Sequence, residues 1–126
     1  MDFHENQPIY QQIIAWVHDK ILKREWPEEQ RIPSVRELAM QIGVNPNTVM
    51  RAYEKLQDEE VIYNKRGVGF FTASGAADSI RKEQRLHFLQ EELPALFAKM
   101  DVLNVPLEEI IRYYEQFKSS SDENKQ

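Results

Sequence analysis

The sequence predicts a mostly α-helical chain with one small β-hairpin, and three observations carry that prediction. Apolar residues recur at helical spacing along most of the 126 residues. Residues 32–49 contain two helix-start signals separated by a glycine. Residues 61–72 contain two short β-prone runs on either side of a basic, glycine-containing stretch. The first part of the chain should therefore combine helices with a hairpin, and the remainder should be helical.

The first helix is expected over residues 8–24. Its apolar positions follow the helical period, and the residues between them are mostly polar or charged. Pro8 suits the start of a helix, because the amide hydrogen that proline lacks would have no helical partner there. Trp26, Pro27 and the charged stretch after them should end the helix and lead to the next one. The apolar positions are Tyr10, Ile13, Ile14, Val17 and Ile21.

Two short helices joined by a tight turn are expected next. Ser34 can cap the first of them, and Glu37 can bond back to the cap in the reciprocal S-x-x-E arrangement. Gly43 can end this helix, Asn45 can cap the following one, and Pro46 suits its first turn. Such a pair is a helix-turn-helix, in which the first residues of the second helix enter the DNA major groove. DNA binding is therefore the first functional expectation.

The second helix of this motif is expected to continue to about Glu60. Two strands, Val61–Tyr63 and Phe70–Thr72, should follow it, joined by a basic turn over residues 64–69. Three helices followed by a hairpin is the order of a winged helix-turn-helix. The apolar positions expected to be buried in this part are Val49, Ala52, Tyr53 and Leu56, with Phe70 and Phe71 under the wing.

The chain is expected to divide into a winged helix-turn-helix domain, residues 1–75, and a short helical appendage, residues 76–118. Small residues at positions 74–77 mark the joint between them. The polar residues 119–126 are expected to form a disordered C-terminus.

The appendage should contain two amphipathic helices. Pro94 removes a helical hydrogen bond and should divide or kink the first near Glu92–Leu93, and Pro106 should open the second. Two such short helices cannot enclose their own apolar residues. They must pack on the winged helix or on a second copy of the chain, and the second copy predicts a homodimer suited to palindromic DNA.

One long ordered pattern resembles a known family. It begins at Pro8-Ile9-Tyr10-Gln11-Gln12-Ile13, continues through IPSVRELA-x2-IGVNPNTV-x2-AY-x2-L, and runs to Gly67-Val68-Gly69-Phe70-Phe71. This pattern is similar to the N-terminal signature of GntR-type bacterial transcription regulators, and the short C-terminal part looks most like their YtrA subfamily. The one departure in the loop is Glu28-Glu29, where relatives more often carry Pro-Gly. The resemblance implies a dimeric repressor that binds double-stranded operator DNA, with a neighbouring transporter-type operon as its target.

The candidate DNA-binding residues of the helix-turn-helix are polar. The resemblance places a DNA contact at Arg36; a surface ion pair with a nearby Glu is its alternative. Asn47 can bond an adenine edge and Thr48 can touch a phosphate or a thymine methyl group, whereas Asn45 can serve simply as the helix cap. Arg51 can face a phosphate or a carboxylate.

Two departures and the wing complete the candidate interface. Pro46 and Met50 occupy positions where the wider family often carries Arg, so those two contacts are not carried over. Lys65, Arg66 and Gly67 form the expected wing tip, where the cations can meet phosphates or the minor groove and Gly permits close backbone approach. Solvation of the tip is the alternative.

The charge balance keeps a second hypothesis open. The chain carries 16 basic and 21 acidic side chains, for a net charge of −5. DNA-binding proteins usually show a basic surface, so the interpretation depends on the cations lying near the reading elements. The alternative is a winged-helix protein-interaction module without specific DNA binding.

Other function classes find no support in the sequence. There is no cysteine, no phosphate-binding glycine loop, and no hydrolase or metalloprotease motif, so neither enzymatic activity, a cofactor nor a bound metal is expected. The N-terminus does not resemble a signal peptide and no apolar run approaches about 20 residues, which predicts a cytoplasmic protein without membrane contact. Any small-molecule effector should bind between subunits or between appendage and winged helix, because a pocket of about 300 Å³ exceeds what this appendage can enclose.

Overall fold

The computed structural model describes residues 1–123. The chain forms two compact units, Met1–Gln84 and Arg85–Gln126. The division falls within a helix and not at the small residues 74–77. Ala76, Ala77 and Ile80 are buried in the core of the first unit, which explains why that unit extends beyond the expected boundary at residue 75.

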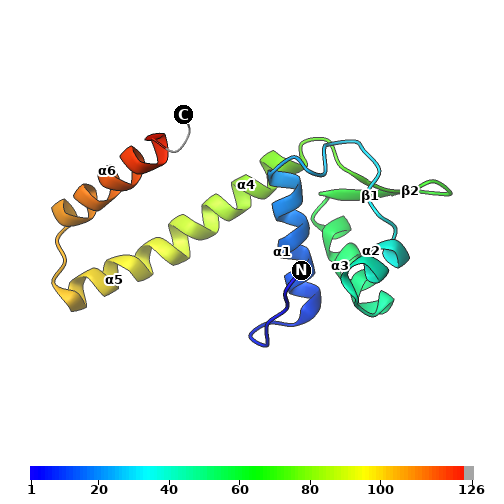
Figure 1. Ribbon diagram of the computed structural model, residues 1–126, viewed down its shortest axis with the longest axis horizontal. Helices are drawn as coiled ribbons and strands as arrows, with labels where there is room; N and C mark the ends of the chain where they lie inside the picture. The colour runs from blue at the N-terminus through cyan, green and yellow to red at the C-terminus, as the bar shows by residue number, and fades with distance from the viewer. Residues whose placement is uncertain (124–126) are drawn as a thin grey trace. The chain divides into compact units, whose positions relative to one another are not determined.

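The first unit is a winged helix-turn-helix (Figure 1). Helices α1 (Ile9–Leu22), α2 (Val35–Ile42) and α3 (Pro46–Asp58) precede strands β1 (Ile62–Lys65) and β2 (Gly69–Thr72), and α4 (Ala76–His87) follows. The two strands pair in antiparallel register, with Ile62 opposite Thr72 and Lys65 opposite Gly69. The element order predicted from the sequence is therefore confirmed.

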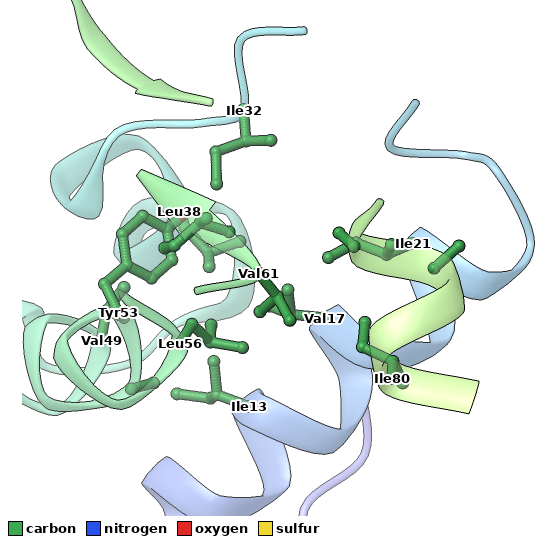
Figure 2. Packing of buried hydrophobic residues seen from close by; sticks show 14 of the residues in the cluster. Ile13, Val17, Ile21, Ile32, Leu38, Val49, Tyr53, Leu56, Val61 and Ile80 are labelled. Carbon is green, nitrogen blue, oxygen red and sulfur yellow. The ribbon is translucent and has the colours of Figure 1, made fainter. Parts of the chain in front are cut away.

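The core of this unit lies where α1 and α3 meet, with α2, the hairpin and the start of α4 around it (Figure 2). Apolar residues at helical spacing from α1 and α3 supply most of it, as the sequence predicts. Tyr10 and Ile14 are only half-buried at its edge. The core residues labelled in Figure 2 are Ile13, Val17, Ile21, Ile32, Leu38, Val49, Tyr53, Leu56, Val61 and Ile80.

The hairpin differs from expectation in two ways. Asn64 and Lys65 belong to β1, which shortens the turn to residues 66–68. Phe71 does not lie under the wing with the core: its ring stacks on Tyr63, with ring centroids 5.6 Å apart. Phe70 instead contacts the buried ring of Tyr53 edge-on at 5.0 Å. The two phenylalanines separate because consecutive side chains of a strand point to opposite faces.

From residue 85 to residue 123, the second unit consists of helical segments and one short connection before the last helix. A π-helical turn, η1 (Phe88–Glu92), follows α4, and α5 (Leu93–Leu103) begins next to Pro94, where the sequence predicted a division. Asn104 adopts a left-handed conformation with φ of 55° and ends α5, and α6 (Leu107–Glu123) completes the unit. Residues 119–123 are helical, so the disorder expected from residue 119 is wrong for them, and residues 124–126 lie outside the described part.

Candidate nucleic-acid interface

The helix-turn-helix is fixed by caps that its own sequence supplies. The hydroxyl of Ser34 accepts a bond from the Glu37 backbone N–H at 3.1 Å, and the Glu37 carboxylate accepts one from the Ser34 backbone N–H at 3.2 Å. The bond from the Ser34 backbone N–H, and next the Ser34 hydroxyl, lower the pKa of the Glu37 carboxyl group. Gly43 takes the left-handed conformation with φ of 69° that ends α2. The Asn45 side-chain oxygen accepts from the Asn47 N–H at 2.8 Å, which confirms its cap role.

A part-buried hydrogen bond couples the two helices of the motif. The hydroxyl of Tyr53, on α3, donates to the carbonyl of Pro33 at 2.6 Å, just before the cap of α2. Burial raises the pKa of Tyr53, so the phenol keeps the proton that it donates. The buried face of α3 is thereby held in place and the opposite face is left to solvent.

The predicted contact residues of α2 and α3 lie at the surface. Arg36, Asn45 and Asn47 are exposed, and Thr48 is half-buried. Asn45, Asn47 and Thr48 lie at the cap and first turn of α3, the part that enters the major groove in helix-turn-helix proteins, whereas Arg36 lies in the first turn of α2. Their positions match the expected interface, while their contacts with DNA stay a prediction.

The predicted wing residues lie at the end of the hairpin. Lys65 is the last residue of β1, and Arg66 and Gly67 form the turn that the Val68 N–H closes onto the Lys65 carbonyl at 2.9 Å. All three predicted residues are exposed, and Gly67 has a φ of 79° that favours glycine. The Lys65 ammonium lies 5.7 Å from the centre of the Phe71 ring. The wing therefore presents two cations at one end of the sheet.

Arg51 makes a contact that sequence reasoning did not weigh. Its guanidinium carbon lies 3.9 Å from the centre of the Tyr10 ring, on α1. In the described residues no carboxylate forms an ion pair with Arg51. Tyr10 was expected only as an apolar position of α1, because the sequence does not show which residue of α3 it meets.

Arg31 is a second residue that sequence reasoning missed. The segment before α2 forms a β-bridge in which Arg31 pairs with Phe71 of β2. The Arg31 guanidinium lies against Gly69, where a Cβ atom would stand 3.1 Å from its Nε. Its charge also helps to lower the pKa of Glu37. Arg31 thus adds a cation between α2 and the wing, through a pairing that no local pattern reveals.

Two exposed acidic side chains have partners on α1, away from these cations. Glu59, after α3, lies 2.9 Å from the ring nitrogen of His18, and Glu25 accepts an ion pair from Lys20 at 2.6 Å. Both pairs involve the middle and end of α1, not the turn of the motif.

Within residues 1–123, no helix is long and apolar enough to cross a membrane.

Comparisons with known proteins agree with this geometry. Residues 9–72 match the model of the bacterial regulatory proteins of the gntR family. The HTH-type transcriptional repressor YtrA of Bacillus subtilis is 34% identical over 87% of this chain and 84% of its own length. A GntR-family protein from Bacteroides thetaiotaomicron has a similar structure, with a TM-score of 0.79, 46% identity, and coverage of 90% of this chain and 99% of the other.

A third similarity concerns the first unit. The DNA-binding domain of AraR, solved in complex with operator ORR3, matches with a TM-score of 0.52 and 27% identity over 58% of this chain and 88% of that domain. The family model, the full-length relatives and the capped helix-turn-helix with its wing all agree. This chain therefore belongs to the GntR family of bacterial DNA-binding transcription regulators and is of the YtrA type.

Proposed function

We propose that the chain binds operator DNA as a homodimer and represses transcription by occupying a promoter. The observation that carries this proposal is the start of α3, where Asn45 and Asn47 are exposed, in a unit whose hairpin also carries an exposed basic tip. Two relatives support it: YtrA of Bacillus subtilis is a transcriptional repressor, and the AraR domain is bound to an operator. The protein-interaction alternative has no comparable support.

The contacts divide into two kinds. Arg36 and Asn47 are assigned to base-directed or closely oriented contacts, with Asn45 and Thr48 beside them at the groove edge. Lys65 and Arg66 are assigned to the backbone, and Gly67 allows the wing backbone to approach it. Arg51 is assigned to a contact with a phosphate of the DNA backbone.

Affinity measured at several salt concentrations separates these two kinds of contact. The probe is the DNA upstream of the chain's own gene, with a duplex of scrambled sequence beside it. Arg36→Ala and Asn47→Ala should each weaken operator binding by about 1–3 kcal/mol with little effect on scrambled DNA. Lys65→Ala and Arg66→Ala should weaken both duplexes alike and reduce the salt slope by about one unit for each phosphate that is no longer neutralised. Wild-type affinity in all four variants would refute the assignment.

The homodimer is supported by the second unit, Arg85–Gln126. None of the residues 85–122 is buried in the single chain, although the unit is rich in large apolar side chains. On α5 and α6, Val102 is 80% exposed, Phe117 is 67% exposed and Tyr113 is 65% exposed. A helical unit with no buried residue lacks the core that stabilises a fold, and a second copy would cover these side chains. Two-fold symmetry would then match a palindromic operator.

Phe117→Glu tests the homodimer without disturbing the protomer, because the side chain is already exposed. Gln116→Glu is the matched control, since it adds the same charge at the neighbouring exposed position of α6. Light scattering at micromolar concentration should give a dimer for wild type and Gln116→Glu and a smaller mass for Phe117→Glu. A monomeric wild type would refute the proposal.

The target and signal complete the proposed function. The YtrA-type assignment supports a transporter-type operon beside the gene, read in the cytoplasm where the chromosome lies. We infer that any effector binds between the second units of two copies, because none of residues 85–122 is buried and could line a cavity within one unit. A reporter carrying the operator over its promoter should be repressed when the chain is expressed, and activation would contradict repression.

A further inference from the structure

A hollow lies between the start of α1 and the start of α3. Pro8, Ile9 and Tyr10 line one side of it and Asn47, Thr48 and Arg51 line the other, around a volume of about 490 Å³. The helices that form the two walls pack closely on each other within the first unit. The lining contains one cation, three neutral side chains with hydrogen-bond donors (Tyr10, Asn47 and Thr48), and no carboxylate. Its chemistry therefore suits a single anionic group.

The cation of this hollow is held by an aromatic ring. At 3.9 Å from the ring centre, the Arg51 guanidinium carbon is in van der Waals contact with Tyr10. Stacking occupies the flat face of a guanidinium and leaves the N–H groups at its edge available to an oxygen ligand. A cation–π contact of this kind restricts a long side chain that would otherwise adopt many rotamers.

The ring itself is firmly placed. Tyr10 is half-buried against the hydrophobic core. Two residues further on, the buried amide of Gln12 donates to the carbonyl of His4 at 2.7 Å and to that of Gln7 at 2.9 Å. These bonds fix the chain that leads into Pro8. The wall that carries the ring is therefore ordered before any ligand arrives, which lowers the entropic cost of binding.

We propose that this hollow holds one phosphodiester group of the DNA backbone, bound by Arg51, and that Tyr10 is the positioning residue for that contact. The inference rests on the proposed function, since the hollow adjoins the part of α3 assigned to the major groove. A phosphate held here fixes the depth and rotation of α3 relative to the bases, which is the role of backbone contacts in sequence-specific complexes. Tyr10 thus acts on DNA recognition through Arg51.

The test measures affinity for two duplexes of about 30 base pairs, long enough for two half-sites. One is selected by the wild-type chain from random DNA, and the other is its scrambled version. Arg51→Gln should weaken binding to both by about tenfold, the loss expected for one charge-assisted hydrogen bond, and should lower the salt slope. Tyr10→Leu keeps an apolar side chain but removes the aromatic face, and should weaken both by about three- to fivefold.

Two further readouts separate positioning from packing. Tyr10→Phe keeps the ring and should restore the affinity that Tyr10→Leu reduces, because the tyrosine hydroxyl bonds only the exposed Gln11 side chain among the described residues. In an Arg51→Gln background, Tyr10→Leu should have no additional effect. Ethylation of one phosphate per half-site should weaken DNA binding by the wild type. The same ethylation should leave the affinity of Arg51→Gln unchanged.

Lys20 supplies the matched control. It also lies over an aromatic ring of α1, 5.1 Å from the centre of Trp16, but it pairs with Glu25 and does not line the hollow. Lys20→Gln should leave affinity unchanged, which separates a local contact from a change in total charge. The inference is overturned if Arg51→Gln behaves like Lys20→Gln, or if Tyr10→Phe is as weak as Tyr10→Leu. If either of these two outcomes is found while Arg36→Ala still impairs operator binding, the proposed function is retained and only this inference is refuted.

Discussion

Replacement of Tyr53 by phenylalanine removes one atom at the centre of the helix-turn-helix. The ring and its edge-on contact with Phe70 remain, but the Pro33 carbonyl loses the hydroxyl that donates to it at 2.6 Å. Loss of one part-buried hydrogen bond costs about 1 kcal/mol. For a unit of the size of Met1–Gln84, that loss lowers the melting temperature by roughly 4–8 °C.

The pH dependence of this difference identifies its cause. Burial raises the pKa of Tyr53 above its ordinary value of 10.0, so the folded chain keeps the proton at a pH where the unfolded chain loses it. The stabilisation is thus fully present below pH 10.0 and declines above it by about 1.4 kcal/mol per pH unit. Tyr53→Phe has no such loss. The free energies of unfolding of the two proteins should therefore become equal about one pH unit above the pH at which the decline begins.

Urea unfolding at a fixed protein concentration, followed by circular dichroism from pH 7 to 11, measures both effects. Ser74→Ala serves as a control, because it removes an exposed hydroxyl for which the structure shows no hydrogen bond among the described residues. Equal stability of wild type and Tyr53→Phe at pH 7 would refute the reasoning. So would a difference between them that stays constant up to pH 11.

Three smaller predictions concern the backbone around the interface, each measured by urea unfolding. Ser34→Ala removes the cap of α2 and should cost about 1 kcal/mol, and an unchanged midpoint would contradict the capping box. Gly69→Ala should cost about 1–3 kcal/mol, because φ is 141° there and the new Cβ meets Arg31; a neutral result would place the wing backbone elsewhere. Glu29→Gly should raise stability by up to about 1 kcal/mol, since Glu29 has a left-handed φ of 60°; destabilisation would show that this loop is not strained.

Local signals carried most of what could be predicted. The caps at Ser34 and Asn45, the turn at Gly43 and the buried stripe of α3 depend on residues within a few positions of one another. The loop keeps a left-handed turn at Glu29 although a glutamate is unfavourable in that conformation. The fold followed because these signals occur in the order of a winged helix-turn-helix.

The details that escaped prediction depend on long-range packing. Tyr10 meets Arg51 across 41 positions of sequence, and Arg31 pairs with Phe71 across 40, so no periodicity could indicate either contact. The side of the hairpin to which Phe71 points depends on how the two strands pair. The sequence of a four-residue strand does not determine that pairing. The first unit extends into α4 because Ile80 contributes to its core, and composition alone suggested a joint before it.

Selection of binding sites from a random duplex library by the full-length chain tests the central claim most directly. If α3 and the wing read DNA, sequencing of the bound duplexes should give one recurrent two-fold symmetric site, with half-sites about one helical turn apart, or a multiple of that spacing. Affinity for this site should exceed that for its scrambled version by at least about 10³-fold at the same salt concentration. Enrichment of no sequence, or equal affinity for the selected and scrambled duplexes, would contradict the claim that α3 and the wing read DNA.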